Sequence, residues 1–161
     1  TAKFLEKLPS NWKRTRSEKI HLSYLFLGNN VQKSKIEQII KNLEEMPKPL
    51  NKLRVRCLGL GAFPSSRYAS VLWIGANGEG LVELANLIRQ RMKVFSIEDK
   101  NAFLPHITIA RSAKKDNLDF LLNSYKDFEC SKVWQINSFE LVESLRMSSG
   151  YVYKTIKKFE W

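Results

Sequence analysis

The chain contains only two histidines, and both belong to the same short pattern. Each lies in an apolar run, residues 19–28 and 103–111, bounded by charged or turn-forming residues, and such runs predict buried strands. In each run a hydroxyl residue follows the histidine by two positions, and alternation along a strand puts the two side chains on one face. The two units are His21 with Ser23, and His106 with Thr108.

A single histidine on a strand most often makes an ordinary structural hydrogen bond. Ser and Thr make up 19 of the 161 residues, so two independent matches to the pattern would arise by chance roughly once in seventy trials. The repetition therefore favours a functional pair over two unrelated histidines.

The chemistry of the four side chains explains why a pair is needed. Imidazole has an unperturbed pKa near 6.5, so at neutral pH one ring can accept a proton while the other donates one. The two hydroxyls can donate hydrogen bonds to an anionic oxygen between them. We therefore predict a phosphodiester site without a metal, in which His21 and His106 are catalytic and Ser23 and Thr108 bind phosphate.

This arrangement resembles the 2H phosphoesterase superfamily, and within it the LigT-like RNA 2′,3′-cyclic phosphodiesterases, which are also called 2′-5′ RNA ligases. The family pattern is His-x-[Ser/Thr]-apolar, present twice. The segments that carry the resemblance are residues 21–28 and 105–111, with weaker matches at Trp12, 59–74, 138–145, Gly150 and Tyr153.

The resemblance implies hydrolysis of RNA 2′,3′-cyclic phosphate ends, tRNA-derived ends included, to 2′-phosphomonoesters without a cofactor. It casts His21 as proton donor and His106 as proton acceptor, although a two-histidine site is nearly symmetric. Reverse 2′-5′ ligation is an accessible second reaction. Two alternatives stay open: a non-catalytic RNA-binding module, and a 2H phosphodiesterase acting on a nucleotide or ADP-ribose cyclic phosphate.

Further residues are candidates for binding the substrate. The resemblance places Arg111 near the phosphate, but strict alternation would put it on the face opposite to His106, so we predict a bend or strand end after Ala110. Phe63 and Arg67 lie in a loop whose aromatic and guanidinium groups could hold an unpaired base and its phosphate. An ordinary turn with Phe63 in the core is the alternative. Tyr24, beside the first motif, is a third substrate-binding candidate.

Composition narrows the class of protein. A hydrophobic fraction of 43% and a charged fraction of 27% indicate a globular chain, and a net charge of +11 favours a polyanionic partner. Cys57 and Cys130 form neither a metal-ligand spacing nor a disulfide framework, which favours the cytoplasm. No apolar run reaches the length of a membrane span, so no membrane partner is expected.

The pattern of elements predicts an α+β fold. Helices are expected at 31–46, 81–95 and 115–128, and further strands at 53–60, 70–76, 133–145 and 151–161, with Phe139, Leu141 and Val142 in the core. We expect residues 1–161 to form a single domain and a monomer, with two similar lobes of mostly antiparallel sheet, helices outside, a pseudo-twofold axis and a central cleft. The family's N-terminal strand is expected to be missing.

Overall fold

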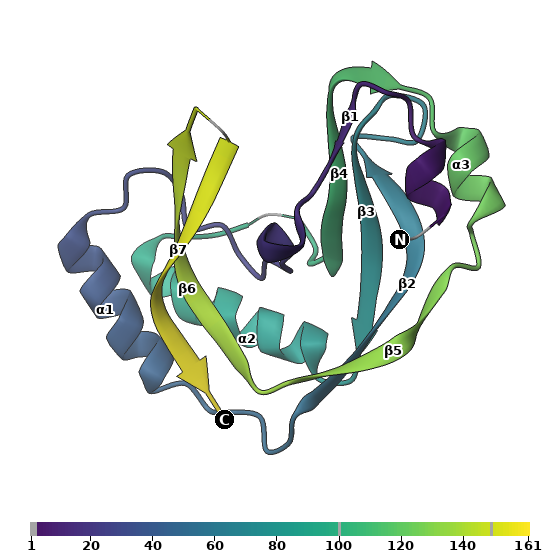
Figure 1. Cartoon of the computed structure of the whole chain (residues 1–161). Coiled ribbons are helices and arrows are strands. Elements are labelled where there is room, and N and C mark those ends of the chain that lie inside the picture. The colour runs from purple at the N-terminus through teal and green to yellow at the C-terminus, as the bar shows by residue number, and fades with distance from the viewer. Residues whose placement is uncertain (1–2, 100, 149) are drawn as a thin grey trace. The chain divides into compact units, whose positions relative to one another are not determined.

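The computed structural model describes residues 3–99, 101–148 and 150–161 (Figure 1). These residues divide into two compact units, and each unit is assembled from three separate segments of the chain. The first unit comprises the described residues of Thr1–Ser23, Arg56–Asn77 and Leu104–Val133, and the second unit comprises those of Tyr24–Val55, Gly78–Phe103 and Trp134–Trp161. The first unit therefore contains the second histidine motif and the first motif as far as Ser23.

The first unit is built on a five-stranded sheet with the strand order β1-β4-β3-β2-β5. Its strand β4 pairs antiparallel with β1 on one side and with β3 on the other. The strands are β1 (Trp12–Arg14), β2 (Leu53–Phe63), β3 (Ala69–Gly78), β4 (His106–Asp116) and β5 (Glu129–Ile136), of which β2, β3 and β5 have one end in the second unit. The helical and antiparallel elements together confirm the predicted α+β class.

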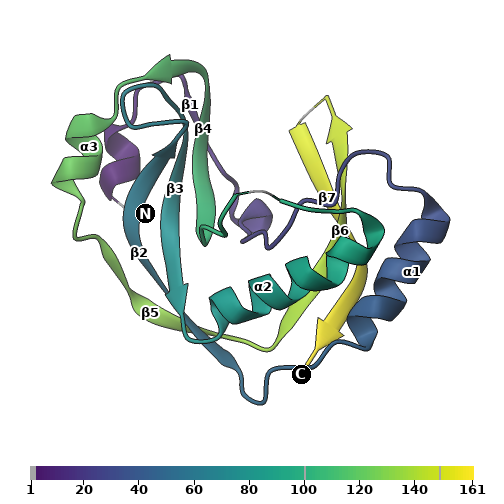
Figure 2. The ribbon, with the colours of Figure 1, turned by 180° about the vertical axis from the view of Figure 1, so that it is seen from behind.

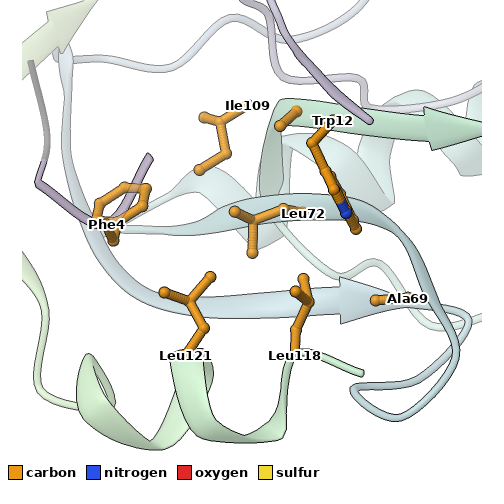
Figure 3. Close-up of a cluster of buried hydrophobic side chains, with 8 residues drawn as sticks. Phe4, Trp12, Ala69, Leu72, Ile109, Leu118 and Leu121 are labelled. Carbon is orange, nitrogen blue, oxygen red and sulfur yellow. The ribbon is translucent and has the colours of Figure 1, made fainter. Parts of the chain in front are cut away.

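One face of this sheet is covered by the N-terminal 3-10 helix η1 (Lys3–Lys7) and the short helix α3 (Asp119–Ser124). Their apolar side chains meet those of the central strands in a buried cluster (Figure 3). At its margin the indole N–H of Trp12 donates to Asp116 Oδ2 at 2.8 Å, which joins β1 to the far end of β4. The cluster contains Phe4, Trp12, Ala69, Leu72, Ile109, Ala110, Leu118 and Leu121.

The second unit packs two helices against a hairpin (Figures 1 and 2). They are α1 (Lys33–Glu44), α2 (Leu81–Met92, continued by the 3-10 helix Lys93–Phe95), and the strands β6 (Ser138–Met147) and β7 (Gly150–Glu160). The apolar periodicity predicted for both helices is confirmed, because residues four apart are buried on each: Ile39 and Leu43 on α1, and Leu84 and Ile88 on α2.

The first motif differs most from its prediction. Residues 19–28 do not form a continuous buried strand, because only Leu22 makes a β-bridge, and it follows a 3-10 turn at Ser17–Lys19. Phe26 is 70% exposed. The apolar run crosses from the first unit to the second between Ser23 and Tyr24, and the ring of Tyr24 packs in the second unit. The apolar residues of the run therefore belong to two different environments and not to one strand.

Three further boundaries were predicted wrongly. Strand β4 continues to Asp116, and α3 has only six residues in place of the helix expected over 115–128. The strand expected at 133–145 is divided at Asn137 into β5 and β6. Val142 is 44% exposed and does not join the core. No helix among the described residues is long and apolar enough to cross a membrane.

Candidate active site

The two histidine motifs lie beside each other at the start of strand β4, where the first motif makes an isolated bridge to it. Leu22 forms an antiparallel bridge with Ile107 of β4, and Ile107 packs against the buried cluster. Because neighbouring residues alternate between faces, the side chains on either side of this bridge point away from the core. We call this surface the histidine face; it carries His21, Ser23, His106 and Thr108.

The register of the bridge fixes which side chains are neighbours. In an antiparallel pair centred on Leu22 and Ile107, His21 lies opposite Thr108 and Ser23 lies opposite His106. In a regular pair, opposite residues have Cβ atoms about 4.5–5.5 Å apart, and diagonal neighbours, the positions that His21 and His106 occupy about the bridge, are about 7–8 Å apart. A single phosphate group fits between side chains at that spacing. The predicted set is thus brought together within one unit of the structure.

The turn before the first motif brings His21 to this position. Strand β1 pairs Arg14 with Ala110, and at that register Ile107 would face Ser17. Ile107 instead faces Leu22, which lies five residues after Ser17. The intervening 3-10 turn at Ser17–Lys19 takes up these residues and returns the chain to the edge of β4.

Both imidazole rings are held by the same local hydrogen bond. His21 Nδ1 lies 2.8 Å from the Lys19 carbonyl oxygen, and His106 Nδ1 lies 2.8 Å from the Leu104 carbonyl oxygen. A carbonyl oxygen only accepts, so in each contact Nδ1 is the atom that carries hydrogen. The proton that a neutral ring gains, or a charged ring gives up, is therefore the one on Nε2.

Arg111 reaches the histidine face through a β-bulge. In the pairing of β3 with β4, Leu72 faces Ala110 but Trp73 faces Thr108, so Ile109 has no partner of its own. The extra residue reverses the alternation, and Arg111 comes to the same face as Thr108, where its Nη2 lies 3.5 Å from Thr108 Oγ1. The predicted irregularity exists, but it precedes Ala110, and the predicted strand end is absent.

Lys13 joins the same face from the other neighbour of β4. It is paired with Arg111 in the β1 register, so the two side chains share a face. The next residue, Arg14, points to the core side, where its guanidinium donates to the Leu5 carbonyl oxygen at 3.0 Å. The strand therefore divides these two neighbouring basic residues between its two faces.

Aromatic side chains support His106. Its ring contacts Phe63 edge-on at 5.1 Å between centroids and Trp73 at 5.9 Å, and these two rings lie 5.4 Å from each other. The indole lies over Gly61, where an added Cβ would come within 2.0 Å of Trp73 Cζ2. The sequence did not indicate Trp73 or Gly61, because their role depends on the pairing of β3 with β4.

The three weaker substrate-binding candidates have different surroundings. Phe63 lies with His106, as a substrate contact would require, and not in the buried cluster. Arg67 is ion-paired with Asp119 of α3 at 3.2 Å. Tyr24 belongs to the second unit, where it stacks on Phe103 and burial raises its pKa to about 12.

Arg89 is a residue that the sequence did not single out. Its guanidinium lies over the ring of Phe103 and donates to the carbonyl oxygens of Tyr24 and Asn101, at 3.3 and 2.8 Å. It also pairs with Asp99 at 3.0 Å; the Asn101 backbone N–H and then Arg89 hold the pKa of Asp99 below its usual value. Arg89 thus fixes the residue that follows Ser23 and the segment that leads into the second motif.

Other reactive groups are poorly suited to chemistry here. Burial raises the pKa of Cys57, and the neighbouring Cys130 thiol raises it further. Burial followed by the charge of Glu129 raises the pKa of Cys130. Both thiols are therefore protonated at neutral pH and weakly nucleophilic. Within the described ranges no group of three or more His, Cys, Asp or Glu side chains is arranged to hold a metal ion.

Sequence comparisons agree with the motifs. A profile of the 2′-5′ RNA ligase superfamily matches residues 9–147. The RNA 2′,3′-cyclic phosphodiesterase of Aquifex aeolicus is 32% identical over 95% of this chain and 82% of its own length. The protein of the same name from Methanocaldococcus jannaschii is 30% identical over 99% of this chain and 90% of its own length.

Solved structures show the same fold. A protein of Thermus thermophilus superposes with a TM-score of 0.77 at 26% identity, over 94% of this chain and 82% of that one. Escherichia coli LigT in complex with 3′-AMP gives a TM-score of 0.76 at 20% identity, over 97% and 85% of the two chains. With the profile match spanning both histidine motifs, the chain belongs to the 2′-5′ RNA ligase superfamily.

Proposed function

We propose that the chain is an RNA 2′,3′-cyclic phosphodiesterase that opens cyclic phosphate ends to 2′-phosphomonoesters. The observation that carries this proposal is the bridge between Leu22 and Ile107, because it assembles two His-x-Ser/Thr units on one face. Family membership and the names of the full-length relatives support the choice of reaction.

In the proposed reaction, water attacks phosphorus in line with the bond to the ribose 3′ oxygen. One Nε2 removes a proton from the water, and the other Nε2 gives a proton to the departing 3′ oxygen. The water oxygen becomes the new phosphate oxygen, the P–O3′ bond breaks, and the phosphate stays on O2′. By resemblance we assign His21 as the acid and His106 as the base.

The remaining residues of the histidine face would stabilise charge. Ser23 and Thr108 can each donate a hydrogen bond to a phosphate oxygen in the pentacoordinate state, and Arg111 supplies a positive charge beside Thr108. Phe63, whose ring contacts His106, would contact the terminal base. If a 5′-hydroxyl takes the place of water, the same groups would form a 2′-5′ linkage.

Several expectations remain part of this proposal. They are a single domain with two similar lobes, a pseudo-twofold axis and a central cleft; catalysis without a metal or cofactor; a monomer in the cytoplasm; and RNA ends, tRNA-derived ones included, as partners. Each follows from the resemblance or from composition.

The test is hydrolysis of an oligonucleotide with a 2′,3′-cyclic phosphate end, followed by chromatography with and without EDTA. We expect a 2′-phosphate product, a bell-shaped pH–rate profile and unchanged rates in EDTA. His21→Ala and His106→Ala should each reduce turnover at least about 10³-fold, since each removes one of the two proton-transfer groups. Circular dichroism would check that both variants fold. We expect them to fold, because His21 is exposed and His106 is half-buried.

Two outcomes would replace the proposal. Salt-sensitive RNA binding with no opening of the cyclic phosphate would indicate a non-catalytic RNA-binding module. Faster turnover of a cyclic mononucleotide or an ADP-ribose cyclic phosphate than of the oligomer would indicate a small-molecule 2H phosphodiesterase.

A further inference from the structure

The hairpin of the second unit carries two tyrosines on a solvent-exposed face. Tyr151 lies opposite Arg146, and Tyr153 lies opposite Ser144, in the register of β6 with β7. The two rings are two residues apart on one strand, so they share a face, and they are 52% and 40% exposed. We call this surface the tyrosine face; it carries Val142, Ser144, Arg146, Tyr151, Tyr153 and Thr155.

At the base of the hairpin it is the opposite face that packs. There Phe139 and Phe159 stack at 4.8 Å between centroids, and Lys157 pairs with Glu44 of α1 at 2.6 Å. A register shift between Leu141 and Val142 leaves Ile156 as an extra residue on β7, so Thr155 turns to the face opposite to Lys157, which Val142 takes by ordinary alternation. The tyrosine face therefore points away from α1.

Charge on the outer surface changes along the hairpin. At its base Glu140 accepts a hydrogen bond from Thr155 Oγ1 at 2.7 Å, and Lys158 is ion-paired with Glu160. Nearer the tip the tyrosine face has no acidic residue, and within the described parts of the chain no carboxylate pairs with Arg146. The end that carries the two rings is thus positively charged.

We propose that the tyrosine face binds the single-stranded part of an RNA substrate. Aromatic side chains at alternate positions of a sheet strand stack on unpaired bases, and a guanidinium beside them can hold a phosphate. The net charge of +11 and the guanidinium of Arg146 near the tip fit a polyanion better than a second protein surface. This inference rests on the proposed function only for the identity of RNA as the substrate.

The direct test measures binding to a single-stranded oligoribonucleotide that ends in an ordinary 3′-hydroxyl, by fluorescence anisotropy. Tyr153→Leu should weaken binding about tenfold because it keeps apolar bulk but removes the aromatic face, whereas Tyr153→Phe should bind like the unmodified chain. Arg146→Ala should weaken binding and lower its salt dependence. Lys154→Ala, on the other face of the same hairpin, removes the same charge and should have little effect.

A second measurement separates this inference from the proposed function. Tyr153→Leu should raise the KM for a cyclic-phosphate oligomer and leave kinetics on a cyclic mononucleotide unchanged. If the chain proves inactive, the binding experiment still decides the role of the tyrosine face. Unchanged RNA affinity in Tyr153→Leu would overturn the inference, and so would a loss of self-association in that variant without a change in RNA binding.

Discussion

The two histidine motifs hold their imidazole rings in the same way, although their surroundings in the fold are very different. His106 begins the long strand β4, which has a neighbouring strand on each side, and its ring contacts two aromatic side chains. His21 lies in a segment with a single bridge to β4 and follows a 3-10 turn. Yet each Nδ1 is 2.8 Å from the carbonyl oxygen two residues earlier.

The comparison separates what the chemistry requires from what the fold supplies. A ring held through Nδ1 needs only a short extended stretch and a carbonyl that no strand partner uses. At the second motif Pro105 precedes the strand and leaves the Leu104 carbonyl outside the ladder, while at the first motif the end of the turn supplies it. We therefore expect the motifs to respond alike when their functional groups are removed, and differently when their supports are changed.

After the loss of either imidazole, removing the hydroxyls should give the largest effects. Ser23→Ala and Thr108→Ala should each lower kcat about 10²-fold, since each loses a donor to the developing phosphate charge. Thr108→Ala should be the more damaging, because Thr108 also contacts Arg111. Thr108→Ser serves as the control and should retain most activity. Steady-state kinetics would contradict the shared role if Ser23→Ala were silent while Thr108→Ala was not.

Changing the aromatic support should affect one motif only. Gly61→Ala would drive a methyl group into the Trp73 indole and cost about 1–3 kcal/mol in stability, as overpacking does. Activity should fall about tenfold, and Trp73→Phe in the same chain should restore part of it, because the smaller ring leaves room.

Nuclear magnetic resonance can assign that effect, because the chain has only two imidazoles to observe. Gly61→Ala should move the ring signals of His106, whose neighbours are Phe63 and Trp73, and leave those of His21 in place. Equal shifts of both histidines would show that the aromatic support is not specific to the second motif.

Removing Arg89 should instead disturb both motifs. Arg89→Met loses the hydrogen bonds to the carbonyl oxygens of Tyr24 and Asn101, so the segments adjoining both motifs should loosen and activity should fall several-fold. Arg89→Lys keeps the charge but not the fork of donors and should rescue little. Arg91→Met is the matched control on the same helix, since Arg91 donates instead to the carbonyl oxygen of Glu45. Broadening of one histidine signal alone would contradict this role.

The site could be predicted from sequence to the extent that its chemistry is local. Each histidine and its hydroxyl are two residues apart, so alternation alone places them together, and the repeated pattern suggests that they meet. The face of Arg111 could not be predicted, because it depends on Ile109 and Ala110 both being buried in the cluster. That requirement produces the bulge, and it comes from the packing of other elements.

The errors in the fold have the same origin. The apolar run after His21 was interpreted as one strand, but Tyr24 packs against Phe103 and Phe139, which are distant in sequence. Likewise, the last strand is rich in aromatic residues, yet Tyr151 and Tyr153 are exposed and only Phe159 is buried. A hydrophobic pattern records that a side chain is apolar, and the register and tertiary partners decide whether it is buried.

The smallest expected effect distinguishes charge on the histidine face from charge elsewhere. Lys13 shares a face with Arg111, whereas Lys126 is exposed in the turn that follows α3, so Lys13→Met and Lys126→Met change the net charge equally. Lys13→Met should raise the KM for an RNA end about two- to fivefold at low salt, and the difference should shrink at high salt as the Debye length falls. Lys126→Met should change the KM little. If both variants raised the KM equally at every salt concentration, general attraction by the basic chain would explain the effect, and Lys13 would have no special place beside the phosphate.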